Sequence, residues 1–534
     1  MIITGLSLET LATLVSLVCA LRAFQLFLDF RRLLESIHHL PGYRTIIDHL
    51  SVLECLFPPI PLLNLGHDHS WLLKHAPFAE RGLDIISTVS QWFYVACWPK
   101  AAGSLFIADA NVIKDVVWSR GGRFPKPLGR YAILAFFGEN IIVSEGDQWK
   151  RYRKIAAPAF SESNNTLVWD ATIQIMLDLF DTMWAGQEEV VFNHSVDLTF
   201  QIALFVIGAA GFGRPITWKE DAVVPLGHQL TFKDAIHTVT QDLTLALLVP
   251  RWAMGLTKRF RRARLAFDEL HRYLTEMIHE RQVSQQEDRH NLLSSLLSAN
   301  DDDNLSKDEV KLSDSELIGN IFIFLVAGHE TTAHTLSFAF ALLALHPDKQ
   351  EEMYQHIKRV LPDGRIPTYN DMPSLAYSSA VFNEALRMFP PVSVVTKVST
   401  EDTTFTLADA NGTMKTVVVP KGLELALDVP GLHYNPKYWE DPFSFKPERF
   451  LGEWNRDAFL SFSGGHRGCL GRKFAETEGA AVLTMLISRY TISIKDEPQF
   501  VGETYEQRKA RVLDARSILT LAPTRLPLVF RRRI

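Results

Sequence analysis

The sequence predicts a chain of long helices with a few short strands. The clearest helix is expected from about Ser315 to Leu345, because this stretch is apolar almost throughout and Ser313-Asp314-Ser315-Glu316 offers a capping box at its start. Another helix is expected to begin at Arg472, directly after a glycine-rich loop. Segments with local apolar and β-branched content predict strands at Thr416 to Val419, Leu423 to Leu427 and Tyr490 to Lys495.

The composition favours one large domain after the N-terminal segment. No linker rich in proline, glycine or serine, repeat or low-complexity block follows about residue 45 of the 534 residues. A formal net charge of −6 without a sustained basic tract argues against nucleic acid as a partner. The densest basic cluster, residues 258–264, is explained by a solvated helix face. A surface for an acidic redox partner or for lipid headgroups is the alternative interpretation of this cluster.

The N-terminal segment differs in kind from the rest of the chain. Residues from Leu11 to Leu28 are mostly apolar, and Arg31 and Arg32 follow them. A helix that crosses a bilayer needs about 20 residues, so this segment is just long enough. No small-residue cleavage site follows it, and the arginines lie on its C-terminal side, which predicts a retained anchor over residues 1–30 with the remainder facing the cytosol. Arg22 within the segment leaves an amphipathic helix lying in the membrane interface as the alternative.

A single cysteine in a glycine-rich loop is the strongest candidate for a metal ligand. The run 462–471 reads F-S-G-G-H-R-G-C-L-G, with Cys469 beside Arg467 and just ahead of the predicted helix. Positive charge, a helix N-terminus and free backbone N–H groups all favour a thiolate. The other three cysteines lack zinc-ligand spacing, and structural zinc would need four ligands. One thiolate as the sole protein ligand suits heme iron with an open opposite face.

Polar residues interrupt the long apolar helix at its centre. The interruption reads Ala327-Gly328-His329-Glu330-Thr331-Thr332. A carboxylate and two hydroxyls inside a buried apolar helix are costly unless they find partners or take part in chemistry. A transmembrane helix with a polar site is the other interpretation of this pattern, and the cysteine loop downstream counts against it.

These two segments resemble motifs of the cytochromes P450. The cysteine loop matches the heme-binding signature F-x-x-G-x-R-x-C-x-G at each position. The resemblance implies a heme b cofactor whose iron is axially ligated by the thiolate of Cys469, with Phe462 and Arg467 among the residues that bind the cofactor. A thiolate ligand pushes electron density toward bound oxygen.

The centre of the long helix resembles the oxygen-activating motif A/G-G-x-D/E-T-T of the same family. By this resemblance Gly328 leaves room beside the heme for dioxygen, and Glu330 and Thr331 are the catalytic acid and alcohol that deliver protons during oxygen activation. His329 and Thr332 are weaker candidates, because successive helix residues point about 100° apart and all four side chains cannot face the iron.

Two further motifs resemble the scaffold of the family. Glu384-Ala385-Leu386-Arg387 is similar to its E-x-x-R pattern, with opposite charges at i and i+3 on one helical face. Phe445-Lys446-Pro447-Glu448-Arg449-Phe450 resembles its PERF segment, whose arginine joins the pair in a buried network. The resemblance therefore implies a structural network of Glu384, Arg387 and Arg449.

A third group of residues resembles those that contact the heme propionates in this family. Trp149 and Arg153 are spaced as in its W-x-x-x-R motif, and an indole N–H and a guanidinium both suit a carboxylate. Arg467 is a further candidate for this contact. Lys397 departs from the family, which often has arginine or histidine at that place, so its position beside the cofactor is expected on weaker grounds.

The resemblance covers nearly the whole chain, with all motifs in family order. It implies the cytochrome P450 fold, which is mainly α with a small β-rich subdomain. The expected organisation is an anchor over residues 1–30, a hinge and membrane-proximal segment over 31–70, and a catalytic domain over 71–534. It also implies a microsomal-type, fungal-like monooxygenase in the endoplasmic reticulum membrane. Too few residues follow Cys469 to hold a flavin or iron–sulfur domain, so a separate NADPH-cytochrome P450 reductase is the expected electron donor.

The substrate is expected to be a lipophilic small molecule, because the segments expected to line the distal pocket are largely apolar. A terpenoid or other secondary metabolite ranks first, by analogy with fungal members of the family. A fatty acid or a xenobiotic is the alternative substrate. An isomerase or dehydratase of the P450 fold that does not use O2, and a non-enzymatic heme sensor, are the alternative functions. The expected lining segments are Leu128 to Phe137, Phe322 to Val326 and Val392 to Val395.

Overall fold

A computed structural model describes residues 8–38, 42–47, 91–98, 101–120, 122–214, 217–219, 223–283, 291–301, 311–408, 414–517 and 519–533. The fold is mostly helical with small β-sheets, which confirms the predicted class. The chain divides into two compact units, Met1–Arg130 with Val394–Asn435, and Tyr131–Ser393 with Pro436–Ile534. Most of the predicted hinge over 31–70 lies outside the described residues.

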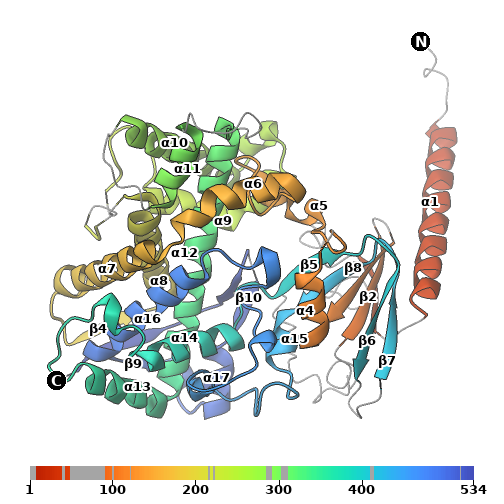
Figure 1. Cartoon of the computed structure of the whole chain (residues 1–534). Helices are drawn as coiled ribbons and strands as arrows, with labels where there is room; N and C mark the ends of the chain where they lie inside the picture. The colour runs from red at the N-terminus through yellow and green to blue at the C-terminus, as the bar shows by residue number, and fades with distance from the viewer. Residues whose placement is uncertain are drawn as a thin grey trace. The chain divides into compact units, whose positions relative to one another are not determined.

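The first unit is built on a five-stranded mixed sheet in the order β1-β2-β3-β8-β5 (Figure 1). Strand β2 pairs antiparallel with β3, β3 pairs parallel with β8, and β8 pairs antiparallel with β5. A separate hairpin joins β6 and β7. The strand predicted at 416–419 is confirmed as part of β7, and the strand predicted at 423–427 is confirmed as β8, which begins one residue later than predicted. The strands are β1 (Gly42–Ile47), β2 (Gln91–Trp98), β3 (Ala102–Ile107), β5 (Val394–Val398), β6 (Thr403–Ala408), β7 (Met414–Val419) and β8 (Glu424–Asp428).

Helix α1 (Leu8–Ser36) begins the described part of this unit. Near its C-terminal end Leu33 lies against Gly103 of β3, where an added Cβ would come within 3.2 Å of the leucine side chain. The helix is otherwise largely exposed, and its apolar window has a mean hydropathy of 2.0. Among the described helices, α1 is the one whose length and composition would allow it to cross a membrane. The other helices of the unit are α4 (Ala110–Trp118), α5 (Leu128–Tyr131) and α15 (Val429–His433).

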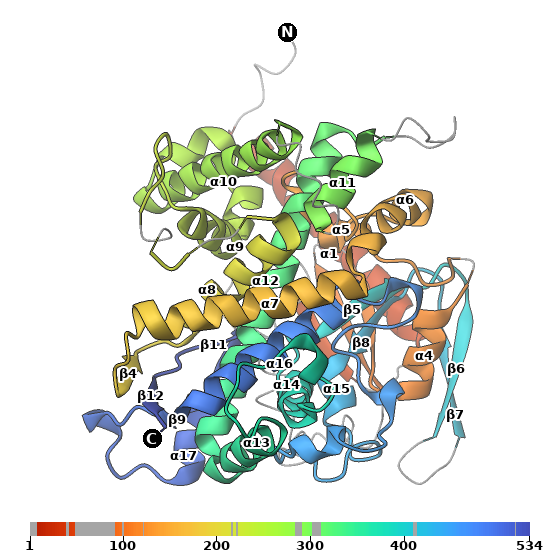
Figure 2. The ribbon, with the colours of Figure 1, turned by 60° about the vertical axis from the view of Figure 1, so that its left-hand side comes forward.

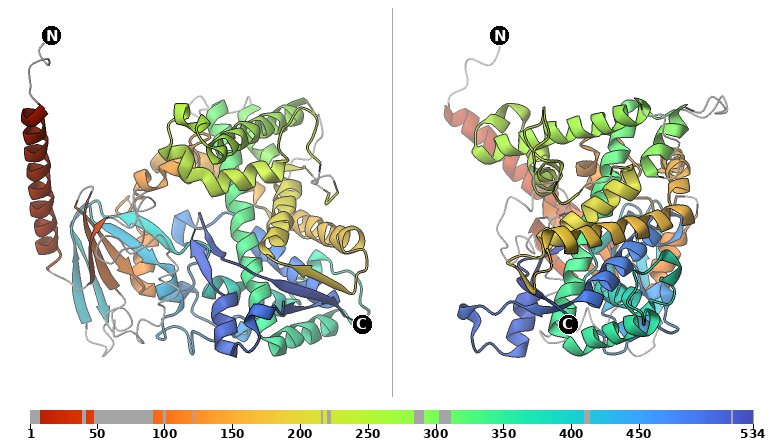
Figure 3. Two further views of the ribbon diagram at one scale, coloured as in Figure 1. Left: turned by 180° about the vertical axis from the view of Figure 1, so that it is seen from behind. Right: turned by 90° about the vertical axis from the view of Figure 1, so that its left-hand side faces the viewer.

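The second unit is arranged around α12 (Asp314–Leu345), which runs through its centre (Figures 1 and 3). The Ser313 hydroxyl accepts from the Glu316 N–H while the Glu316 carboxylate accepts from the Ser313 N–H, so the predicted capping box is confirmed. The helix ends at Leu345, as predicted, and His346 is its C-cap, ahead of Pro347. Its apolar sequence is explained by burial, because nearly every side chain from Leu317 to Leu345 is buried.

Several helices enclose α12 and place the cysteine loop. Helix α8 packs along α12, α14 and α16 pack against each other, and α7 crosses α16 (Figure 2). An added Cβ at Gly479 of α16 would lie only 2.3 Å from the Phe382 ring of α14, so glycine allows this close approach. The main helices are α6 (Gly146–Ala156), α7 (Glu162–Asp178), α8 (Val196–Val206), α9 (Phe232–Leu248), α10 (Lys258–Val283), α11 (Leu292–Asp301), α13 (Pro347–Val360), α14 (Ala376–Met388), α16 (Arg472–Arg489) and α17 (Tyr505–Val512).

Two small antiparallel sheets complete the second unit. The C-terminal strand β12 (Leu528–Arg532) lies between β4 (Glu189–Phe192) and β9 (Tyr490–Ile494), and β9 confirms the strand predicted at 490–495. Strands β10 (Ala515–Ser517) and β11 (Leu521–Pro523) form a hairpin against α12. A π-helical turn, η6 (Ile207–Gly211), follows α8.

Candidate active site

Cys469 lies in the loop that leads into α16, just after a short turn at Gly465–Arg467. Its N–H donates to the Phe462 carbonyl at 2.9 Å, which closes the loop, and the Gly471 N–H donates to its sulfur. Gly465 has a φ of 61°, a left-handed conformation that glycine adopts without strain. The predicted helix start at Arg472 is confirmed, so the thiol lies at a helix N-terminus.

The Cys469 thiol is surrounded by protein in most directions, yet its side chain retains accessible surface. Burial raises the pKa of the thiol, while the Gly471 N–H and the charges of Arg153 and Arg472 oppose that rise. A metal ion that coordinates the sulfur would remove the proton outright. The sulfur is therefore largely enclosed by protein but still accessible to a ligand. This environment suits a metal ion that is bound by a single thiolate.

Two arginines and a tryptophan form a cationic cluster next to this loop. The Arg467 guanidinium stacks on the Trp149 ring at 3.9 Å from its centroid, and that of Arg153 lies 5.7 Å from the same centroid. Arg153 Nη1 donates to the Gly468 carbonyl at 3.0 Å, and Arg467 pairs with Glu145 at 2.5 Å. Arg467 Nη1 is buried and has no hydrogen-bond partner within the described ranges. The cluster therefore has a donor available for an acidic ligand group.

The centre of α12 has one accessible face. Between Gly319 and Leu345 the residues that are not buried are Phe324, Ala327, Gly328 and Thr331, which recur at the i, i+3, i+4 and i+7 spacing of one helical face. We call these four residues the open face of α12. Phe160 connects this face to the cysteine loop, because its ring lies 6.0 Å from that of Phe324 and a Cβ at Gly471 would lie 3.7 Å from it. The structure thus brings two of the predicted motifs together.

The neighbours of the open face are held by hydrogen bonds to the helix backbone. The Thr331 hydroxyl donates to the Ala327 carbonyl at 2.9 Å, and the buried Thr332 hydroxyl donates to that of Gly328 at 3.0 Å. An added Cβ at Gly328 would lie 3.0 Å from the Ile207 side chain of η6. Glycine at this position therefore permits close packing of α12 against η6.

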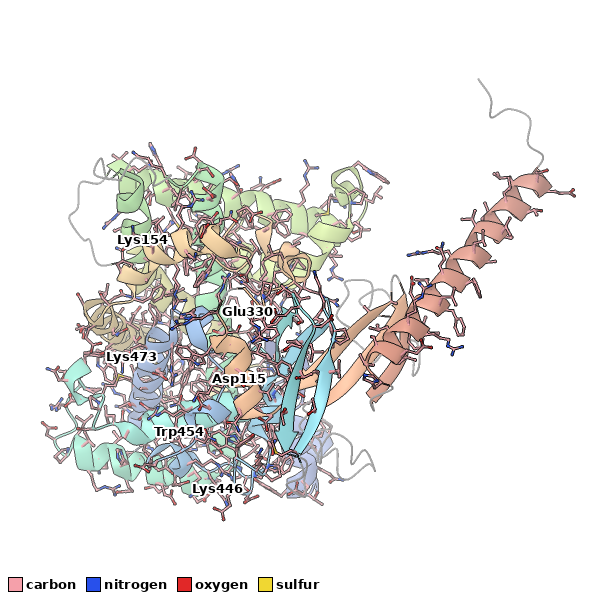
Figure 4. All side chains as sticks on the ribbon, turned by 45° about the vertical axis from the view of Figure 1, so that its right-hand side comes forward. Asp115, Lys154, Glu330, Lys446, Trp454 and Lys473 are labelled. Carbon is pink, nitrogen blue, oxygen red and sulfur yellow. The ribbon has the colours of Figure 1, made fainter. Side chains whose placement is uncertain are left out.

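Glu330, which is labelled in Figure 4, is buried. Its Oε1 accepts a hydrogen bond from the Thr520 hydroxyl at 3.0 Å, and the Thr520 N–H also donates to the carboxylate. Its Oε2 is buried without a partner in the described part of the chain. Burial raises the pKa of Glu330 to about 7, although both bonds from Thr520 lower it. No direct hydrogen bond between Glu330 and Thr331 is found among the described residues.

Two side chains near Glu330 were missed by the sequence analysis. Thr520, in the turn of the β10–β11 hairpin, lies 190 residues beyond Glu330, and His334 Nδ1 lies 2.7 Å from its hydroxyl oxygen. A single threonine in a hairpin turn carries no recognisable pattern. The i and i+4 spacing of Glu330 and His334 on a predicted helix was the available signal.

The scaffold residues form a closed ionic network. Arg387 donates to Glu384 through Nε at 2.7 Å and Nη2 at 2.9 Å, and both side chains are fully buried. Arg449 Nε and the Lys446 N–H also donate to Glu384 Oε1, at 3.2 and 3.0 Å. The Ser461 hydroxyl, just before Phe462, donates to the Leu386 carbonyl at 3.0 Å. This last bond ties the cysteine loop to α14.

The remaining cofactor candidate lies in the first unit. Lys397 is a buried residue of β5 and pairs in register with Leu425 of β8. Its contact with a propionate stays a prediction.

Comparisons with known proteins identify the family. Residues 93–508 match the family model described as Cytochrome P450. The chain is 51% identical over 530 residues to Cytochrome P450 monooxygenase 124 of Postia placenta, covering 98% of this chain and 100% of that protein. It is 30% identical over 429 residues to Cytochrome P450 monooxygenase ORF6 of Penicillium roqueforti, covering 72% and 73%.

The solved structure of the cytochrome P450DA heme domain supports the same fold. It superposes with a TM-score of 0.71 at 20% identity and covers 92% of this chain and 99% of the heme domain. The largely helical chain with small sheets therefore has the fold of that heme domain. The chain belongs to the cytochrome P450 family and is a cytochrome P450 monooxygenase. The family implies heme whose iron is ligated by a cysteine thiolate.

Proposed function

We propose that Cys469 is the axial ligand of heme b in a monooxygenase that inserts one oxygen atom from O2 into a lipophilic substrate. The observation that carries this proposal is the open sulfur of Cys469, linked through Phe160 to the open face of α12. When bound, the heme would supply electron transfer and oxygen activation. The protein residues would bind and orient the heme and deliver protons during oxygen activation.

The cationic cluster has the donors that heme propionates require. Trp149, Arg153 and Arg467 lie together, and the unpartnered Nη1 of Arg467 supports a carboxylate as their ligand. A guanidinium binds a carboxylate through charge-assisted hydrogen bonds. Phe462 closes the loop through its carbonyl, which accepts from the Cys469 N–H. Lys397 is retained as a further propionate contact from β5.

Thr331 and Glu330 are assigned to proton delivery. The Thr331 hydroxyl lies on the open face of α12, where it can hold a proton next to the reacting oxygen. Glu330 has a pKa of about 7, so it exchanges a proton easily at neutral pH. The other three residues of the open face, Phe324, Ala327 and Gly328, carry no polar side-chain group.

The substrate is proposed to be a terpenoid or another lipophilic secondary metabolite. Aromatic residues near α12 support a lipophilic ligand, since the Phe137 and Phe322 rings lie 4.6 Å apart and those of Phe136 and Phe267 lie 4.3 Å apart. The relatives from Postia placenta and Penicillium roqueforti support a fungal type of enzyme.

The electron donor is proposed to be a membrane-bound NADPH-cytochrome P450 reductase. Helix α1 would anchor the chain in the endoplasmic reticulum membrane with its catalytic part in the cytosol. Arg472 and Lys473, the first two residues of α16, provide positive charge next to the cysteine loop for an acidic partner. Lys473 is labelled in Figure 4.

The carbon monoxide difference spectrum of the dithionite-reduced protein tests the proposal. The wild type is expected to give the absorption band from which the family takes its name, and Cys469→Ala is expected to lose it. Cys19→Ala, which changes an exposed cysteine on α1, is the matched control and should keep the band. A full band in Cys469→Ala would contradict the ligand assignment. Spectral titration of the wild type with a sesquiterpene and with lauric acid then compares the two substrate classes.

A further inference from the structure

We propose that His334 and Thr520 form a proton line that supplies Glu330 from the side of the C-terminal hairpin. This inference rests on the proposed monooxygenase function, in which Glu330 gives up a proton in each catalytic cycle. It adds two residues that act through Glu330, and it assigns a task to the turn between β10 and β11.

The three side chains form one continuous hydrogen-bonded chain inside the second unit. His334 Nδ1 lies 2.7 Å from Thr520 Oγ1, and that hydroxyl lies 3.0 Å from Glu330 Oε1. All three residues are buried, with 6%, 6% and 4% of their surfaces exposed. Glu330 and His334 are one turn apart on the same side of α12, and Thr520 from the hairpin bridges them. The chain therefore extends away from the open face.

The atoms of this chain can pass a proton without creating a charge on the histidine. A proton arriving at His334 Nε2 allows the Nδ1 proton to move to Thr520 Oγ1, whose own proton moves to Glu330 Oε1. One N–H bond forms at Nε2 and one breaks at Nδ1, one O–H bond forms and one breaks at Thr520, and one O–H bond forms at Glu330. The net result is a protonated Glu330 and a His334 that has changed tautomer.

His334 differs from the other buried histidine of α12 in a way that suits this role. His329 Nδ1 donates to the Leu325 carbonyl at 2.6 Å, and its Nε2 is buried without a partner among the described residues. Its backbone bond fixes one tautomer. His334 instead faces a hydroxyl that can both donate and accept, so either tautomer keeps the hydrogen bond.

The surrounding charges favour a neutral histidine in the line. Burial, together with the charges of His329, His194, His237 and Arg516, lowers the pKa of His334 to about 3. These groups come from α12 itself, the segment before α8, α9 and β10. Glu330 is faced by Thr520, whose hydroxyl and N–H both favour the ionised carboxylate. A transfer through tautomers avoids the imidazolium that this environment disfavours.

A purely structural role for the same hydrogen bonds makes a different prediction. Thr520 would then hold the Glu330 carboxylate in place, and His334 would only satisfy the hydroxyl. Loss of either bond would change the titration midpoint of Glu330 or the stability of the protein. It would not change how fast Glu330 takes up a proton.

Infrared spectroscopy of the heme-loaded ferric protein separates the two roles. The carboxylic C=O band that disappears in Glu330→Gln identifies the group, and its titration gives the midpoint. Thr520→Val should raise that midpoint by about one pH unit or more, because the carboxylate loses a charge-assisted hydrogen bond. Thr520→Ser should restore it. His334→Asn keeps a donor near Thr520, so its midpoint should stay close to that of the wild type.

The rate of proton uptake after a light-triggered pH jump is the deciding measurement. His334→Asn and Thr520→Val should both slow the appearance of the Glu330 C=O band by about tenfold or more, and Thr520→Ser should not. Ser337→Ala removes another buried hydroxyl of α12, which bonds Ala333, and should leave the rate unchanged. Uptake at the wild-type rate in both His334→Asn and Thr520→Val would overturn the proton line.

The carbon monoxide band of each variant keeps this test separate from the proposed function. A wild type without the band would refute the heme-thiolate assignment, whatever the infrared result. Variants with an intact band and unchanged proton uptake would refute the line alone. The band also verifies that each variant has folded around its cofactor.

Discussion

Two buried glutamates of the second unit have opposite surroundings. Glu384 accepts hydrogen bonds from two arginines and a backbone N–H, so its charge is fully compensated. Glu330 receives bonds from one threonine and has one oxygen without a partner among the described residues. The first arrangement fixes a charge permanently and holds a scaffold. The second leaves the charge adjustable, which proton transfer requires.

The largest change in the free energy of unfolding is expected when the ion pair between Glu384 and Arg387 is broken. Glu384→Gln leaves Arg387 buried with an unbalanced charge and should lower the free energy of unfolding by about 3–5 kcal/mol. Chemical denaturation of the heme-loaded protein measures this change. The matched control is Asp147→Asn, which breaks the pair of Asp147 with Lys150 at the same i and i+3 spacing on an exposed surface.

The exposed control should have a much smaller effect on the free energy of unfolding than Glu384→Gln, because solvent screens its charges. Equal losses in the two variants would mean that burial does not distinguish the Glu384 network. The loop that carries Cys469 is tied to α14 by Ser461, so Glu384→Gln should also reduce heme incorporation. The heme-to-protein ratio after purification measures that second effect.

A smaller, pH-dependent change in the free energy of unfolding is expected for Glu330. The pKa of Glu330 is about 7 in the folded protein and 4.5 for an unperturbed group, so the unfolded chain binds fewer protons than the folded protein between these values. The contribution of Glu330 to the free energy of unfolding is therefore fully present below pH 4.5 and is lost as the pH rises through 7. The total loss is about 3 kcal/mol. Glu330→Gln stays neutral and should lack this loss.

Denaturation of wild type and Glu330→Gln at several pH values between about 5 and 8 checks this prediction. The stability of the variant relative to the wild type should grow with rising pH. A constant difference between the two proteins would show that Glu330 titrates normally. That result would contradict the conclusion that the charge of Glu330 is adjustable whereas that of Glu384 is fixed.

The smallest effect on stability is expected at the open face of α12. Thr331→Ala removes an accessible hydroxyl and should change the free energy of unfolding by less than about 1 kcal/mol. With reductase and substrate, the same variant should release more hydrogen peroxide for each NADPH consumed. Thr332→Ala removes the buried neighbour and is the control. Unchanged peroxide release in Thr331→Ala would remove the assigned role of its hydroxyl.

Local sequence patterns were sufficient for the elements that carry the site. The capping box at Ser313 and the apolar stretch up to Leu345 predicted both ends of α12, and the glycine loop before Arg472 predicted the start of α16. The i and i+3 charges of Glu384 and Arg387 predicted a pair that the structure confirms at 2.7 Å. Each of these features depends on residues a few positions apart.

Contacts between distant residues were not predictable in the same way. Arg467 was expected at the propionates, but its pairing with Glu145 was not foreseen, because the acid lies more than 300 residues earlier. Glu330 and Thr331 were expected to act together, yet adjacent helix residues point about 100° apart and their partners differ. Nothing in the sequence around Thr520 indicated that it would meet Glu330.

The hydrogen bond between Thr520 and Glu330 also has a consequence for how the chain is made. The two residues are separated by 190 positions, so a ribosome exposes α12 long before the hairpin that serves its acid. Until Thr520 has emerged, its hydroxyl and N–H cannot bond the carboxyl of Glu330. Nascent chains that end before Thr520 are therefore expected to leave this carboxyl without those two bonds.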